Sequence, residues 1–121
     1  MMRSQAEFRF SCVVADYLEL AMPVDALWTH FPAGEKRTIA TGARLKRMGL
    51  KPGWPDYLVV SRGRLIGLEL KAGKGKASPV QADVGEGFLR AGFSWVVCRT
   101  LEDVQCALLK CGVALRVRIE T

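Results

Sequence analysis

The sequence predicts an α/β domain in which a mixed β-sheet is flanked by helices, and three observations favour this class. The length of 121 residues fits one domain, residues 1–121, with one modest core. Half of the residues are hydrophobic and a quarter are charged, a balance that excludes a disordered chain, a coiled coil or a fibre. Segments with helical spacing of apolar residues alternate along the chain with short β-branched runs.

The predicted helices are marked by capping residues and by stop signals. Ser4 opens a capping box ahead of the first helix, and Pro23 follows the end of that helix. Ser78, with Pro79 behind it, opens the third helix, and Thr100 caps the fourth. The four helices are expected over residues 5–21, 37–48, 78–90 and 100–110.

The predicted strands are apolar runs bounded by turn residues. Arg62 and Gly63 separate two of them and indicate a tight hairpin, although Arg is not a favoured first turn residue. The final run, 113–119, is expected to close the sheet as an edge strand. The five strands are expected over residues 27–31, 56–61, 64–71, 93–99 and 113–119.

The charge balance favours a polyanionic partner, and nucleic acid is the commonest one. Eighteen Lys and Arg against twelve Asp and Glu give a net charge of +6. Six of the basic residues lie between Glu35 and Asp56 with no acidic residue among them, and three more lie in the loop 71–78. Each of them taken singly could serve solubility alone. The residues expected to contact the phosphates of a nucleic acid are Arg37, Arg44, Lys46, Arg47, Lys74 and Lys76.

Other features narrow the class of protein. No apolar run approaches the roughly 20 residues of a membrane span, and the N-terminus lacks the apolar stretch of a signal peptide, so we expect a cytoplasmic protein without a membrane partner. Four cysteines without a CxxC pair and one histidine do not fit the usual zinc spacing. The loop 71–78 lacks the P-loop spacing, so no nucleotide cofactor is expected.

The predicted hairpin brings two carboxylates and a lysine to one spot. With Arg62 and Gly63 as the turn, facing residues have numbers that sum to 125, so Asp56 faces Glu69. Lys71 lies on the same side of the sheet as Glu69 because strand side chains alternate. Mg²⁺ prefers carboxylate oxygens and would offset the like charges. On spacing alone, a charged sheet edge with Lys71 paired to Glu69 is the favoured interpretation.

At these residues the chain resembles a known family of nucleases. The run Gly53-Trp54-Pro55-Asp56, followed by an apolar strand and then Glu69-Leu70-Lys71, is similar to the PD-(D/E)xK signature. Four further short runs match the same family, namely Lys46–Gly49, Ser78–Gln81, Ala91–Gly92 and Cys98–Thr100. Together they identify the resemblance as one to the VRR-NUC (virus-type replication-repair nuclease) family, over about residues 28–112.

The resemblance implies a restriction-endonuclease-like core and a set of site residues. Asp56 and Glu69 would bind Mg²⁺ or Mn²⁺, with the Leu70 carbonyl completing the inner shell. Lys71 would orient or deprotonate the attacking water, and Gln81 would position the water or the substrate. A bound metal lowers the pKa of its water, while the protein mainly positions the reacting parts.

Two further positions are left open by the resemblance. Glu7 matches a helix glutamate that often adds a metal ligand, but its place in the capping box explains it equally well. His30 begins a stretch that resembles the H-x-P-N-G-G-x-R run of small phage members, with Ala33 in place of Asn and Glu35 in place of the second Gly. A lone histidine is more often a loop or core residue than a catalyst, so His30 is not assigned a catalytic role.

The expected function is therefore metal-dependent hydrolysis of phosphodiester bonds in DNA. The resemblance implies branched DNA as the substrate, as for a junction resolvase, in phage or bacterial replication, recombination or repair. It also implies a homodimer, for which the helix 100–110 and the strand 113–119 are candidate interfaces. The alternatives are a non-catalytic DNA-binding module with the same fold and a small interaction protein whose acidic pair belongs to a salt-bridge network.

Overall fold

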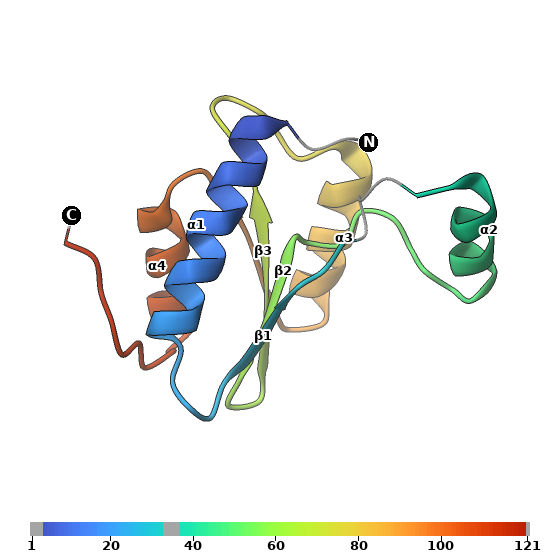
Figure 1. Ribbon diagram of the computed structural model, residues 1–121. Coiled ribbons are helices and arrows are strands. Elements are labelled where there is room, and N and C mark those ends of the chain that lie inside the picture. Colours follow the sequence, from blue (N-terminus) through green and yellow to red (C-terminus); the bar gives the residue numbers. More distant parts are fainter. Residues whose placement is uncertain (1–3, 33–36, 121) are drawn as a thin grey trace.

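The computed structural model describes residues 4–32 and 37–120 and contains a four-stranded sheet with helices on both faces (Figure 1). The strands lie in the order β1-β2-β3-β4. The pairs β1–β2 and β2–β3 are antiparallel, whereas β3–β4 is parallel. This mixed sheet with its helices confirms the predicted α/β class. The elements are α1 (Gln5–Ala21), β1 (Leu27–His30), α2 (Ile39–Arg47), β2 (Tyr57–Ser61), β3 (Arg64–Leu70), α3 (Pro79–Arg90), β4 (Ser94–Cys98) and α4 (Leu101–Lys110).

The two faces of the sheet are covered by different helices. Figure 1 shows α1 and α4 on one side of the sheet and α3 on the other. Ile66 and Leu68 of β3 belong to the core shared with α1 and α4. Gly67 between them faces α3, because a Cβ on Gly67 would meet the Phe88 ring at 3.0 Å. The odd-numbered residues at this end of β3 therefore point toward α3, and Glu69 is one of them.

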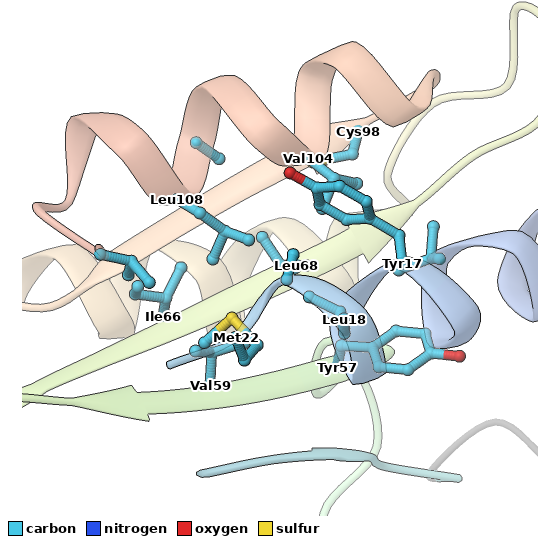
Figure 2. Packing of buried hydrophobic residues seen from close by; sticks show 14 of the residues in the cluster. Tyr17, Leu18, Met22, Tyr57, Val59, Ile66, Leu68, Cys98, Val104 and Leu108 are labelled. Carbon is cyan, nitrogen blue, oxygen red and sulfur yellow. The ribbon is translucent and has the colours of Figure 1, made fainter. Parts of the chain in front are cut away.

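The hydrophobic core lies between the sheet and the helices α1 and α4 (Figure 2). Leu18, Val59, Leu68 and Leu108, from four different elements, are fully buried in it. Burying side chains of this size contributes about 1.5–3 kcal/mol each, so this face supplies most of the stability. The opposite face of the sheet has fewer large apolar side chains and is therefore free to carry polar groups.

The β2–β3 hairpin has the predicted two-residue turn and the predicted register. Arg62 has φ 48° and Gly63 has φ 77°, so both turn residues are in the left-handed region that such a connection requires. The pairing runs from Ser61 opposite Arg64 to Tyr57 opposite Leu68, so facing numbers sum to 125 as expected.

The predicted closing strand 113–119 is wrong, because the structure contains no strand in this segment. Instead, the Arg116 N–H donates to the Ala21 carbonyl at 2.7 Å. The Gln105 side chain binds both main-chain groups of Ile119, at 3.1 and 2.7 Å. Val113, Leu115 and Ile119 thus pack against the core that α1 and α4 share, whereas Val117 is exposed. Within the described residues, β4 is left as an edge of the sheet.

The helix α2 stands apart from the sheet in Figure 1 and buries none of its residues. Thr38 caps it, accepting a hydrogen bond from Thr41 N at 3.1 Å, so the helix is shorter than the predicted 37–48. Its last turn carries Arg44, Lys46 and Arg47. No helix in the described part of the chain is long and apolar enough to cross a membrane.

Candidate active site

Asp56 and Glu69 lie next to each other where the β2–β3 hairpin opens. Asp56 directly precedes β2, and the register Tyr57 opposite Leu68 continues to Asp56 opposite Glu69. The Leu70 N–H donates to Asp56 Oδ2 at 2.7 Å, which ties the first carboxylate to the strand that carries the second. Asp56 is 8 % exposed and Glu69 only 1 %. Two carboxylates this deeply buried require compensating interactions, because burial penalises the charged form.

Lys71 supplies a positive charge at the same place. Its Nζ lies 3.9 Å from Glu69 Oε2, and the lysine side chain is 15 % exposed. Its main-chain N–H donates to the Cys98 carbonyl at 3.0 Å, so the parallel β3–β4 pairing continues past the end of β3 and fixes Lys71. The structure thus brings together the three residues that the sequence placed on one side of the hairpin.

The loop before Asp56 is shaped by two close approaches that only glycine permits. Gly53 has φ 86°, and a Cβ there would lie 2.6 Å from Val80 Cγ1 at the start of α3. A Cβ on Gly67 would lie 2.6 Å from the Pro55 ring. Pro55 is itself fully buried. The Gly-Trp-Pro-Asp run therefore docks between the sheet and α3, and this docking positions the Asp56 carboxylate.

Aromatic packing supports the same loop. The Trp54 ring stacks on Phe31 with centroids 5.8 Å apart and meets the edge of Phe88 at 5.3 Å. The Phe31 N–H donates to the Asp56 carbonyl at 2.7 Å. His30 lies one residue earlier on β1, half-buried, with its ring 5.2 Å from that of Tyr57. Ala33 and Glu35 of the predicted phage-like stretch lie outside the described residues.

Gln81 sits at the beginning of α3, close to this loop. Its Oε1 accepts from Ser78 N at 2.9 Å, and Ser78 Oγ accepts from Gln81 N at 3.2 Å, which forms a complete capping box. The side-chain oxygen thereby uses one of its two lone pairs in the helix cap. The other lone pair and the two amide N–H donors are what Gln81 can offer to a water or a substrate.

Glu7 is placed in the first turn of α1, where its N–H donates to Ser4 Oγ at 3.1 Å. Among residues 4–32 and 37–120, no group of three or more His, Cys, Asp or Glu side chains is close enough to hold a metal ion. The structure therefore does not gather Glu7 with Asp56 and Glu69. The Leu70 carbonyl, which is expected to complete the inner shell, belongs to the residue whose N–H binds Asp56. Carboxylate and carbonyl oxygens are hard donors of the kind that suits Mg²⁺ or Mn²⁺.

The predicted DNA-contacting residues fall into two groups. Arg44, Lys46 and Arg47 are exposed on α2, and Arg37 just before it donates to the Pro32 carbonyl at 2.6 Å. Lys74 and Lys76 are exposed on the loop between β3 and α3. Both groups lie in connections at the end of the sheet that carries Asp56 and Glu69.

One residue near the site received no role in the sequence analysis, although it lies in the run Cys98–Thr100. Arg99, directly after β4, donates through Nη1 to the carbonyls of Gly73 and Gly75 in the loop that carries Lys74 and Lys76. These contacts span 26 and 24 residues and end on main-chain oxygens. No spacing or residue pattern in the sequence could have indicated them.

The comparisons with known proteins agree with this architecture. No protein-family model and no curated protein matches the chain. One solved structure, described as a VRR_NUC domain protein, is 23 % identical with a TM-score of 0.69, over 90 % of this chain and 89 % of that one. A second, described as a VRR_NUC domain, is 21 % identical with a TM-score of 0.56, over 88 % of this chain and 97 % of that one. The chain therefore has the fold of the VRR_NUC domain proteins, which is the fold that its motifs led us to expect.

Proposed function

We propose that this protein is a metal-dependent DNA endonuclease of the VRR-NUC family that hydrolyses phosphodiester bonds. The observation that carries the proposal is the cluster of Asp56, Glu69 and Lys71 at the open end of the β2–β3 hairpin. It occurs in a chain with the fold of VRR_NUC domain proteins. Two buried carboxylates side by side repel each other, and a divalent ion between them would offset that repulsion more fully than Lys71 alone.

Each residue has a distinct task in this proposal. Asp56 and Glu69, with the Leu70 carbonyl, would hold Mg²⁺ or Mn²⁺. The ion, when bound, supplies positive charge to the scissile phosphate and acidifies a water molecule. Lys71 keeps its ammonium beside Glu69, where it can orient the attacking water and offset negative charge on the phosphate. Gln81 offers its amide nitrogen as a donor to the water or the phosphate.

The substrate is DNA, and the resemblance makes branched DNA the first choice, in phage or bacterial replication, recombination or repair. The basic residues of α2 and of the loop 71–78 would follow the phosphate backbone on either side of the carboxylates. All four cysteines are free, which suits the reducing cytoplasm in which we place the protein.

Cleavage of a panel of labelled DNAs tests the function. The panel contains single-stranded, duplex, flap, splayed-arm and four-way-junction forms, each with Mg²⁺, Mn²⁺ or EDTA. We expect metal-dependent cutting that is lost in Asp56→Ala and Lys71→Ala. Asp25→Ala, which removes an exposed carboxylate beside Arg62, is the control and should cut normally.

Two other outcomes would overturn the proposal. DNA binding without cutting under every metal would identify a non-catalytic DNA-binding module. If calorimetry detected neither Mn²⁺ nor DNA binding, the protein would be a small interaction protein whose acidic pair is structural.

We also propose that the protein acts as a homodimer, joined through the β4 edge. The Cys98 carbonyl points to β3, since it accepts a hydrogen bond from Lys71 N. Main-chain groups alternate in direction along a strand, so those of Trp95 and Val97 point outward.

A groove of about 470 Å³ follows this edge between α3 and α4. Asp103 and Lys110, near opposite ends of α4, both line it. Pairing two β4 edges about a two-fold axis would bring the Asp103 side chain of each protomer toward Lys110 of the other.

Cross-linking at Cys106 tests this dimer, because Cys106 is exposed, lines the groove and lies midway along α4, near the expected axis. A short bis-maleimide should trap a covalent dimer that is lost in Cys106→Ser and retained in Cys12→Ser, the exposed control on α1. Lys110→Glu should weaken the dimer in sedimentation. A monomer at high concentration would contradict the proposal.

A further inference from the structure

The loop from Ala72 to Ala77, which we call the basic loop, joins Lys71 at the end of β3 to the cap of α3. It contains Lys74 and Lys76, and residues 73–76 are all exposed. Gly73 has φ 58°, and a single turn bond from Gly75 N to the Ala72 carbonyl, at 3.2 Å, closes the loop. A glycine-rich loop loses more conformational entropy than any other on becoming ordered, so one turn bond is a weak restraint.

Arg99 supplies a second restraint from outside the loop. Its Nη1 donates to the Gly73 carbonyl at 3.1 Å and also to the Gly75 carbonyl. These two carbonyls belong to the residues on either side of Lys74. Hydrogen bonds from a charged donor are about twice as strong as neutral ones, so the guanidinium fixes this part of the main chain.

Arg99 is itself held in place on both sides. The preceding residue, Cys98, accepts from Lys71 N at 3.0 Å, so the parallel pairing puts Arg99 beside the start of the basic loop. The Arg99 N–H donates to Asp103 Oδ2 at 2.8 Å in the cap of α4. The main chain at Arg99 is therefore anchored to the sheet and to α4, which gives the guanidinium a firm base.

We infer that Arg99 is a positioning residue that holds the basic loop in the shape that presents Lys74 and Lys76 to DNA phosphates beside Asp56, Glu69 and Lys71. An arginine in a region that already contains three lysines adds electrostatic repulsion, so its charge is not there to stabilise the loop by neutralisation. What holds the loop is the pair of hydrogen bonds that the two carbonyls accept from the guanidinium, whose N–H groups point in fixed directions. The identity of the ligand, DNA, rests on the proposed function. The restraint of the loop by Arg99 is independent of that function.

Limited proteolysis tests the restraint without DNA. Trypsin cleaves after Lys74 and Lys76, and an ordered loop fits its active site poorly. We expect Arg99→Gln to speed cleavage at these two positions about tenfold or more, as local opening becomes easier. Arg99→Lys, which keeps a charged donor but lacks the planar fork, should restore part of the protection. Arg90→Gln, which removes an exposed arginine paired with Glu86 on α3, is the control and should leave the loop protected.

Binding to DNA, measured in Ca²⁺ or EDTA so that no cutting occurs, tests the purpose of the restraint. Arg99→Gln should weaken binding about 3- to 10-fold and raise KM while kcat changes less than about twofold. In a Lys74→Ala/Lys76→Ala background, the same substitution should have almost no further effect on binding.

The outcomes separate the two proposals. Unchanged trypsin cleavage in Arg99→Gln, or an effect on binding that is equally large with and without the two lysines, would overturn the positioning role. The second result would instead make Arg99 a direct phosphate contact. If the wild-type protein binds no DNA, the proposed function fails, whereas the proteolysis still decides whether Arg99 restrains the loop.

Discussion

At the scale of single residues, the Asp56 carboxylate has a structural role and a proposed chemical one, and these can be separated. Its Oδ2 accepts from Leu70 N at 2.7 Å in a buried position. Asp56→Asn keeps an oxygen acceptor there but removes the charge. We expect this variant to unfold in urea within about 1 kcal/mol of the wild type and to cut DNA at least 100-fold more slowly.

Asp56→Ala is the contrasting variant. It leaves the Leu70 N–H buried without an acceptor, so it should cost about 1–3 kcal/mol of unfolding free energy in addition to the activity. Retained cleavage by Asp56→Asn would show that the negative charge is not needed, and that result would contradict the proposed metal ligand.

Cys98 gives the stability a predictable dependence on pH. Burial, assisted by Asp103 and Cys106, raises the pKa of the Cys98 thiol from 9.0 to about 12. Above pH 9 the unfolded chain loses this proton while the folded chain keeps it, so stability falls as the pH rises. The wild type should lose about 1.4 kcal/mol between pH 8 and pH 10 relative to Cys98→Ala.

The measurement is the unfolding free energy of both proteins in urea at several alkaline pH values. Ionisation of all other groups is common to the two, so the difference between the curves isolates Cys98. Val104→Ala, which truncates a buried side chain that carries no titratable proton, is the control, and its curve should run parallel to that of the wild type. A constant difference between wild type and Cys98→Ala across the range would contradict the prediction.

At the scale of elements, local signals in the sequence were sufficient where contacts are local. The Arg62–Gly63 turn fixes the register of β2 against β3, and this register alone brings Asp56 to Glu69. The helix caps at Ser4, Ser78 and Thr100 were also predicted, because a cap is made by residues three positions apart. Because these contacts are local, the pairing of Asp56 with Glu69 could be predicted from the sequence.

The segment 113–119 was misread for the opposite reason. Its alternation of apolar and basic residues is typical of a strand, and it equally allows an extended tail to lay one side on two helices. Gln105 and Ala21 supply partners for its main chain, and neither can be identified from the segment itself. The contacts of Arg99 with the basic loop were missed for the same reason, since they join its guanidinium to main-chain carbonyls that are distant in the sequence.

The hairpin turn offers a test at this scale. Arg62 has φ 48°, a region that Asn occupies more readily than Arg, and Asn-Gly is the preferred pair for this turn. Arg62→Asn should therefore raise the free energy of unfolding by about 0.5–1 kcal/mol, measured in urea. The ion pair lost with Asp25 joins exposed groups 3.5 Å apart and contributes little. Arg62→Ala loses the same pair without relieving the turn, so it should be no more stable than the wild type.

At the scale of the whole molecule, the topology gathers the chemistry at one end of the sheet. The β1–β2 connection carries α2, and the β3–α3 connection carries the basic loop. Both begin or end where Asp56, Glu69 and Lys71 lie, so the basic residues of the two connections lie at the same end of the sheet as the two carboxylates. Figure 1 shows α2 projecting beyond the body formed by the sheet and the other helices. Most helices in proteins are stabilised by packing, and α2, which has no buried residue, gains little from it. The use that we propose for its exposed basic surface is DNA binding.

The salt dependence of DNA binding measures that use. Each phosphate contact adds about 0.9 to the slope of log K against log salt concentration, so replacing Arg44, Lys46 and Arg47 by Gln should lower the slope by up to about 2.7. The thermal midpoint should change little, because α2 buries none of its residues. A control that replaces Arg9, Arg90 and Arg118 by Gln removes the same charge from exposed positions outside α2 and should lower the slope by less than half as much. Equal slopes for the two triple variants would mean that DNA responds only to net charge, and α2 would then have no specific part in binding.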